Sequence, residues 1–242
     1  MCTLEKQGNI FILTLTGDDD HRLNPTLLDS ITAAIHRIRS ETTTPSALIT
    51  TAQGKYFSNG YDLAWSKADP NRFIVMSTKL RSIIKDLISL PMPTIAAVTG
   101  HASAGGFILA LAHDYVMMRK DRGFLYMSEM DIKRVVPDWL VKLFKNKIGS
   151  PAALRDVIMR AEKVTAEMAV AKGIIYSAHG SAAETVTAAV KLGEELVSRN
   201  WDGHVYARNR KVLLGDVLSA MNSQVTVQDM IAANFITSSS KL

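Results

Sequence analysis

Apolar residues recur at two different spacings in the first half of the chain, and the spacing separates predicted strands from predicted helices. Residues 10–16, 47–51 and 94–99 are short, mainly apolar runs rich in β-branched side chains, which is typical of buried strands. Two longer segments repeat apolar residues every three or four positions, and each opens with a proline at its first turn. These stripes predict amphipathic helices, with Leu27, Leu28, Ile31, Ala34, Ile35 and Ile38 in the first and Phe73, Met76, Leu80, Ile83, Ile84 and Leu87 in the second.

The same alternation continues to residue 118. Residues 104–112 read as a buried helix and residues 115–118 as another strand. Strands that alternate with helices at this spacing are typical of βα units with parallel pairing. We therefore expect an α/β fold.

The second half of the chain is richer in helices. Ser150 and Thr165 are predicted N-caps, and Ser181 with Glu184 forms a capping box for a helix that reaches about residue 199. A last amphipathic helix is predicted over residues 205–221. We expect a β/α core over residues 1–195 and a C-terminal helical region over residues 196–242.

Composition and charge narrow the class of protein. The chain is 47% hydrophobic and 21% charged, as in an ordinary globular protein, and its lone Cys2 has no internal disulfide partner, which favours a reducing compartment. The net charge is +5, and residues 119–163 hold the whole excess, with eleven basic and six acidic side chains. A coat that binds nucleic acid would spread over more of the chain, so we expect no nucleic-acid partner. A basic rim facing an anionic ligand and an unevenly charged solvent face both fit this pattern.

Two segments bear on location in the cell. Residues 87–112 carry no formal charge, but prolines and glycines break them into pieces too short to cross a bilayer, so no membrane segment is expected. Ser240-Lys241-Leu242 is the tripeptide that the peroxisomal import receptor reads. The sequence therefore predicts a peroxisomal protein with that receptor as a partner.

Two turns could present backbone N–H groups to a ligand. Phe57-Ser58-Asn59-Gly60-Tyr61-Asp62-Leu63 follows a strand, and Gly60 allows a sharp turn. Residues 99–107 combine small residues with Gly105 and Gly106 at a helix N-terminus, where N–H groups lack partners. A plain strand-to-helix turn and close strand–helix packing remain open as readings of these two segments.

A third segment offers a candidate base. Glu129 stands among Met and aromatic residues, and burial there would raise its pKa, as suits a general base. A solvent-facing Glu at a strand end is the alternative.

Taken together, these segments resemble the crotonase superfamily, the enoyl-CoA hydratases and isomerases. The resemblance covers residues 5–200 and includes both turns, Asp114, Met127-Ser128-Glu129, and the run from Thr165 to Ile175. With the Ser-Lys-Leu ending, the chain is most similar to the plant-type peroxisomal 3,2-enoyl-CoA isomerases of that family.

The resemblance implies roles for particular residues. The backbone N–H groups of Tyr61 and Gly105 would form an oxyanion hole for the thioester oxygen of an acyl-CoA, and Glu129 would be the catalytic acid/base. Further residues fall on substrate-binding positions of the family: Ser58, Asn59, Gly60, Asp62, Ala104 and Ile108.

One departure from the family decides the expected reaction. Hydratases of the family use two glutamates, and the first of these positions is Ile108 here. Adding water needs a carboxylate pair, whereas moving a double bond needs one base. We therefore expect conversion of 3-cis- or 3-trans-enoyl-CoA to 2-trans-enoyl-CoA in peroxisomal fatty acid β-oxidation. An enoyl-CoA hydratase or other acyl-CoA lyase, and a catalytically silent acyl-CoA-binding protein, are the alternatives.

The resemblance also implies the architecture and the assembly. The expected fold is a crotonase-type spiral of ββα turns with a C-terminal helical region, and family members form trimers or pairs of trimers. The chain has no His/Cys cluster at ligand spacing and no dinucleotide fingerprint, so no metal and no cofactor is expected beyond the coenzyme A of the substrate.

Overall fold

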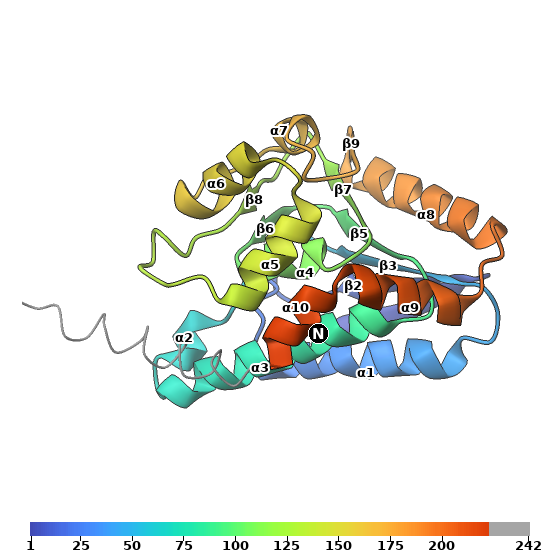
Figure 1. Ribbon diagram of the computed structural model, residues 1–242, viewed down its shortest axis with the longest axis horizontal. Coiled ribbons are helices and arrows are strands. Elements are labelled where there is room, and N and C mark those ends of the chain that lie inside the picture. The colour runs from blue at the N-terminus through green and yellow to red at the C-terminus, as the bar shows by residue number, and fades with distance from the viewer. Residues whose placement is uncertain (223–242) are drawn as a thin grey trace, which may run out of the picture.

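The computed structural model describes residues 1–222, which build two β-sheets with helices packed around them (Figure 1). The larger sheet has the strand order β1-β2-β3-β5-β7-β9 and the smaller one the order β4-β6-β8. The strands of the larger sheet are β1 (Cys2–Gln7), β2 (Ile10–Leu15), β3 (Ala47–Ala52), β5 (Thr94–Val98), β7 (Tyr115–Arg119) and β9 (Ser177–His179). Those of the smaller sheet are β4 (Tyr56–Ser58), β6 (His101–Ser103) and β8 (Leu125–Tyr126).

Parallel pairing dominates both sheets. β1 and β2 pair antiparallel through a tight connection, and every other neighbouring pair is parallel. Parallel neighbours need a crossover, and helices supply most of these connections. The predicted α/β class is confirmed.

Three consecutive ββα turns link the two sheets. In each turn the first strand joins the larger sheet and the next joins the smaller one, as in β3–β4, β5–β6 and β7–β8. Each pair of strands then leads to helices: α2 (Leu63–Ser66) with α3 (Pro70–Ser89), α4 (Gly105–Leu111), and α5 (Asp138–Lys147). The expected spiral of ββα turns is therefore present, and it stacks the ends of β4, β6 and β8 side by side.

The larger sheet separates two apolar layers. Ile10 and Ile12 of β2 face α8 (Ala182–Ser198), whereas Phe11 and Leu13 face the opposite core, because side chains alternate along a strand. α1 (Pro25–Glu41) and α3 lie on that opposite side, as Figure 1 shows. α4 is buried along its whole length within the same core.

The predicted helix starts are borne out by side-chain caps. Asn24 accepts a hydrogen bond from the Leu27 N–H at 3.0 Å, and Asp69 accepts one from the Asn71 N–H at 2.8 Å. Ser181 accepts from the Glu184 N–H at 3.2 Å at the start of α8. The predicted caps Ser150 and Thr165 open α6 (Pro151–Met159) and α7 (Ala166–Ala171).

The C-terminal region differs from the prediction in one respect. The single helix expected over residues 205–221 is wrong, because two helices, α9 (Gly203–Leu213) and α10 (Gly215–Asn222), occupy this stretch. Leu214 leaves the helical conformation with φ −105° and ψ 25°, and Gly215 starts the next helix. α9 packs on α3 and α10 on α5.

The structure of residues 1–222 does not test every prediction made from the sequence. The expected boundary after residue 195 lies within α8 and stays a prediction. Ser240-Lys241-Leu242 lies outside the described residues. Among residues 1–222, no helix combines the length and apolar character needed to cross a bilayer.

Candidate active site

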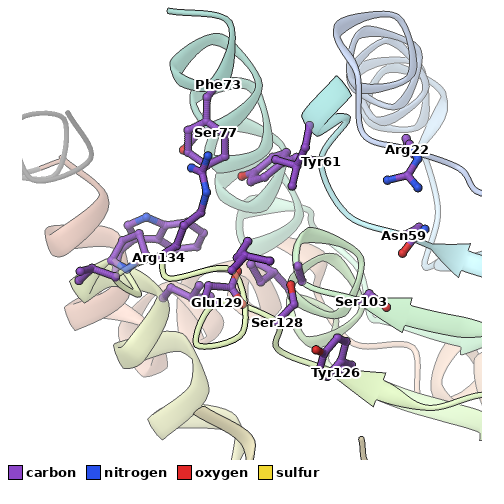
Figure 2. A pocket seen from close by; sticks show the side chains of 18 residues that line it. Arg22, Asn59, Tyr61, Phe73, Ser77, Ser103, Tyr126, Ser128, Glu129 and Arg134 are labelled. Atoms are coloured by element: carbon purple, nitrogen blue, oxygen red, sulfur yellow. The ribbon is translucent and has the colours of Figure 1, made fainter. Parts of the chain in front are cut away.

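A cavity of about 270 Å³ lies where the ends of the small-sheet strands meet α3 and α5. Figure 2 shows Tyr61, Phe73 and Ser77 on one side of it and Glu129 and Ser128 on the other. Five of the residues predicted from the sequence line it: Asn59, Tyr61, Ala104, Ile108 and Glu129.

The turn after β4 brings the Tyr61 backbone to the cavity. Gly60 has φ +73°, a left-handed conformation that favours glycine, and its carbonyl accepts from the Leu23 N–H at 2.8 Å. Asp62 caps α2 by accepting from the Trp65 N–H at 2.9 Å. The turn is thus held at both ends, and the Tyr61 N–H lies between these two anchors.

The turn after β6 carries the second expected donor. Ala104 has φ +45°, which is strained for a residue with a Cβ, and its N–H donates to the Tyr126 carbonyl at 2.7 Å. Gly105 follows as the first residue of α4, so its N–H has no partner within the helix. A strained residue beside a cavity is characteristic of a functional site.

The two turns touch one another. A Cβ placed on Gly60 would lie 3.3 Å from the Gly105 nitrogen and 3.2 Å from the Ala104 Cβ. Within residues 1–222, neither the Tyr61 N–H nor the Gly105 N–H donates a hydrogen bond. Two neighbouring, unused N–H donors are what binding of an oxyanion requires.

Glu129 lies in the loop that follows β8. The Glu129 carbonyl accepts from the Arg134 N–H at 2.8 Å, and the Ser128 carbonyl accepts from the Ile132 N–H at 3.0 Å. These bonds fold the loop back on itself. The Glu129 Oε2 atom is buried and finds no hydrogen-bond donor in the part of the chain that the structure describes.

The surroundings of Glu129 make it a better base than an exposed glutamate. Burial raises the pKa of its carboxyl group, while a hydrogen bond from its own backbone N–H and the charge of Arg134 act in the opposite direction with less effect. A carboxylate whose ionised form is destabilised binds a proton more readily. This is the state that proton abstraction from a weakly acidic carbon requires.

Apolar side chains close the cavity around this carboxylate. Ile108 of α4 is 3% exposed, and Trp139 and Leu140 of α5 are each 2% exposed. Glu129 is the only carboxylate that lines the cavity within residues 1–222. The described part of the site therefore has a single candidate base beside an apolar wall.

Several lining residues were not assigned to the site from the sequence. Phe73 and Ser77 come from α3, where Phe73 read as part of the apolar core stripe. The Tyr61 ring meets Phe73 edge-on at 5.2 Å between centroids, and its hydroxyl hydrogen-bonds Ser77. Burial raises the pKa of the Tyr61 phenol, which stays neutral. A helical stripe gives no sign of which of its members face a cavity, so these residues were missed.

Four of the predicted residues lie beside the cavity rather than in its lining: Ser58, Gly60, Asp62 and Gly105. The Ser58 hydroxyl donates to the His21 carbonyl at 2.8 Å, so its contacts brace the turn. Gly60 and Asp62 shape that same turn, as described above. Gly105 offers only its backbone. Substrate contact by the first three of these residues stays a prediction.

The arrangement has the parts needed to form and reprotonate an enolate. Unused N–H donors stand ready for a carbonyl oxygen that gains charge, and one buried carboxylate stands ready to carry a proton. Residues 1–222 contain no group of three or more His, Cys, Asp or Glu side chains suited to holding a metal ion.

Comparison with known proteins agrees with this geometry. The family model for enoyl-CoA hydratase/isomerase matches residues 5–239. The chain belongs to the enoyl-CoA hydratase/isomerase family. This is the crotonase family that the sequence motifs resembled, and the resemblance is confirmed.

Curated relatives place the chain within one branch of the enoyl-CoA hydratase/isomerase family. Enoyl-CoA delta isomerase 1, peroxisomal, of Arabidopsis thaliana is 63% identical over 219 residues, which cover 90% of this chain and 91% of that protein. Enoyl-CoA delta isomerase 2, peroxisomal, of the same plant is 46% identical and covers 94% of this chain and 98% of its own length.

Solved structures of the enoyl-CoA hydratase/isomerase family share the fold. The apo enoyl-CoA isomerase of Mycobacterium tuberculosis superimposes with a TM-score of 0.84 at 22% identity, covering 96% of this chain and 97% of that one. An enoyl-CoA hydratase from Mycobacterium ulcerans has a TM-score of 0.85 at 20% identity, with 96% and 98% covered. At such low identity, the likeness establishes the architecture alone.

Proposed function

We propose that this protein is an enoyl-CoA delta isomerase that converts 3-cis- or 3-trans-enoyl-CoA to 2-trans-enoyl-CoA. The observation that carries the proposal is that, within residues 1–222, Glu129 is the lone carboxylate lining a cavity in which buried Ile108 stands at the position of the hydratases' first glutamate. The names of the two Arabidopsis relatives support the same reaction.

The first step forms an enolate. The thioester oxygen accepts hydrogen bonds from the Tyr61 and Gly105 N–H groups, and the Glu129 carboxylate removes a proton from C2. The electron pair of that C–H bond moves into the C1–C2 bond, and negative charge gathers on the oxygen. Because the donors are already fixed in the two turns, they stabilise this charge without reorganising.

The second step returns the same proton to another carbon. The protonated Glu129 donates its proton to C4, where the π pair of the C3–C4 double bond forms the new C–H bond. The C1–C2 pair of the enolate moves to C2–C3, the thioester carbonyl reforms, and the Glu129 carboxylate is regenerated. Atoms and electrons balance with no cofactor. The apolar wall of Ile108, Trp139 and Leu140 keeps water from competing for the enolate or adding to the product.

Wider aspects of the proposal rest on the relatives and the sequence. Peroxisomal location is supported by the names of the Arabidopsis proteins. The import receptor stays a predicted partner, on the basis of the Ser240-Lys241-Leu242 tripeptide. A role in β-oxidation of unsaturated fatty acids, a homotrimer or hexamer, and independence from metal or redox cofactors belong to the same proposal.

The test is a panel of enoyl-CoA thioesters given to the purified protein. We expect 3-hexenoyl-CoA to be converted to the conjugated 2-trans isomer, with a gain of ultraviolet absorbance, and the Glu129→Gln variant to lose about 10²–10⁴-fold in kcat. Glu194→Gln, which changes an exposed glutamate of α8, is the matched control and should retain the wild-type rate. Near-full activity of Glu129→Gln would show that another group is the base.

Crotonyl-CoA in the same panel separates the alternative functions. Water addition at a rate comparable with isomerisation would establish a hydratase instead. Tight binding of acyl-CoA without turnover of any 2- or 3-enoyl thioester would identify a silent binding protein.

A further inference from the structure

Arg134 is a cation in the cavity that has no role so far, because it belongs neither to the proposed oxyanion hole nor to the proposed base. It lies in the loop between β8 and α5, lines the same cavity as Glu129, and is half-buried. Its guanidinium carbon lies 4.1 Å from the centroid of the Phe73 ring, so it stacks on the far wall of the cavity. Figure 2 shows it on the Glu129 side, reaching toward Phe73.

Arg134 has no ion-pair partner within the part of the chain that the structure describes. Burial lowers the pKa of its guanidinium, and the one charge that acts against this is Glu129. The influence is mutual, because the charge of Arg134 also lowers the pKa of the Glu129 carboxyl against the larger effect of burial. Both groups line the same cavity, and among the described residues they form no salt bridge with each other.

Backbone hydrogen bonds in the loop over residues 129–134 fix the position of Arg134 relative to Glu129. The Arg134 N–H donates to the Glu129 carbonyl at 2.8 Å, and the Lys133 N–H donates to the Met130 carbonyl at 3.2 Å. Lys133 has φ +57°, the left-handed conformation that closes the loop. Because the loop and the Phe73 ring hold the guanidinium, Arg134 does not need a contact with the carboxylate to stay in place.

The other titratable groups that line the cavity with Glu129, among the described residues, are neutral or already paired. Burial raises the pKa of Tyr61, and a hydrogen bond to Asp131 raises the pKa of Tyr126 to about 12, so both phenols are uncharged at working pH. Arg22, at the other end of the cavity, is paired with Asp20 at 2.9 Å. Among the described residues that line the cavity, Arg134 is the one cation without an ion-pair partner.

We propose that Arg134 is a positioning residue for the isomerisation, whose unpaired guanidinium keeps the buried Glu129 carboxylate in the charged form that removes the proton. The inference rests on the proposed function. A direct salt bridge would occupy the lone pairs that must take the proton, whereas a cation held nearby stabilises the anion and leaves those lone pairs free. Arg134 therefore acts through Glu129 and need not touch the reacting carbons.

The test compares charge removal at two adjacent positions. Arg134→Gln and Lys133→Gln each delete one positive charge, but Lys133 is exposed and lies outside the cavity lining. Lowering the pH from 8 to 5 should reduce kcat/KM of both the wild type and Arg134→Gln. We expect the reduction in Arg134→Gln to be about tenfold larger than the reduction in the wild type. Arg134→Lys should restore most of the wild-type pH profile, and Lys133→Gln should leave it unchanged.

A second measurement does not depend on turnover. In protein labelled with ¹³C at the glutamate carboxyl carbons, the resonance that disappears in Glu129→Gln reports the protonation of Glu129. We expect its titration midpoint to move to higher pH in Arg134→Gln and to stay in place in Lys133→Gln. If this shift occurs in a protein that turns over no 3-enoyl-CoA, the proposed function fails while the electrostatic role of Arg134 stands.

Either of two results would overturn the role of Arg134. One is a titration midpoint and pH profile in Arg134→Gln that superimpose on those of the wild type. The other is an equal shift in Lys133→Gln, which would indicate an effect of net charge and not of the cavity. A purely structural role for Arg134 would lower activity equally at all pH values.

Discussion

Two carboxyl groups that are largely buried, Glu129 in the cavity and Asp114 beside β7, have opposite surroundings. Asp114 accepts hydrogen bonds from the Thr94 N–H at 2.9 Å and from the Tyr206 hydroxyl at 3.2 Å, and it lies 3.0 Å from Arg210. Glu129 Oε2 has no donor within residues 1–222. Asp114 is surrounded by partners, whereas the Glu129 carboxylate accepts a hydrogen bond from its own backbone N–H and leaves Oε2 without a donor among residues 1–222.

The difference separates a group that holds the fold from one that is available for chemistry. Arg210 is 5% exposed; besides its ion pair with Asp114, it donates hydrogen bonds to the Leu87 carbonyl at 2.6 Å and to the Met92 carbonyl. It thereby joins α9 to the end of α3 and to the segment before β5. These donors and the Arg210 charge stabilise the ionised form of Asp114, whereas the poorly solvated Glu129 is better placed to take a proton.

The largest effect on stability is expected on the Asp114 side. Arg210→Met leaves a buried carboxylate and two carbonyls without their cation, so the free energy of unfolding should fall by about 3–5 kcal/mol. Chemical denaturation measures this change. Arg37→Met, which breaks the exposed pair of Arg37 with Glu41, should cost less than about 0.5 kcal/mol.

Isomerase activity of the folded Arg210→Met variant should match the wild type at 25 °C, because Arg210 does not line the cavity. A tenfold loss of kcat in that variant would mean that the surroundings of Asp114 and the cavity around Glu129 are coupled, so stability and activity could not be assigned to separate regions.

A smaller effect is expected where the two turns of the cavity touch. A Cβ on Gly106 would lie 2.7 Å from the Ser58 Cβ and closer still to the Ser58 carbonyl oxygen. Gly106→Ala should therefore push the turns apart, with a loss of about 1–3 kcal/mol in the free energy of unfolding. Because the Tyr61 and Gly105 donors sit on these turns, kcat should fall as well.

Gly149→Ala is the control for Gly106→Ala. A Cβ there meets nothing within 4 Å, so both stability and kcat should stay close to wild type. Full activity in Gly106→Ala would argue against an oxyanion hole built from these two turns.

The smallest predicted effect is a gain in stability, not a loss. Folding raises the pKa of the Glu129 carboxyl group. At a pH above the usual glutamate range, the ionised carboxylate therefore lowers the stability of the folded protein. This loss disappears at lower pH, where the carboxyl group is protonated in both the folded and the unfolded state. Glu129→Gln should raise the melting temperature by roughly 2–4 °C at pH 7.5, with the gain vanishing toward pH 4. The same melts on Glu194→Gln should show no such gain, and a lower melting temperature for Glu129→Gln would contradict the assigned cause.

Much of the fold was readable because long periodic segments carry their own signal. The α1 and α3 stripes and the apolar runs of the larger sheet are strong patterns. β4, β6 and β8 were not predicted, because runs of two or three residues are too short to show any period. The break at Leu214 was missed because the apolar stripe continues across it.

The candidate site was readable only in part. The turns at Gly60 and Gly105 and the proposed base Glu129 stand in contiguous motifs, so a family resemblance located them. Arg134 and Trp139 reach the cavity because the loop after β8 folds back and α5 packs beside α4. Such placement depends on tertiary contacts that no local pattern records.

The repeated ββα turn has a consequence for how the chemistry of this protein can change. The Tyr61 donor, the Gly105 donor and Glu129 each follow a different strand of the smaller sheet, so each arrives on its own module. A substitution on one module, such as the Ile108 found on α4, can alter the reaction while the other modules keep their geometry. If the Tyr61 and Gly105 N–H groups bind the oxyanion as proposed, they form a half of the site that can stay constant, while the acids and bases on the other modules can change independently.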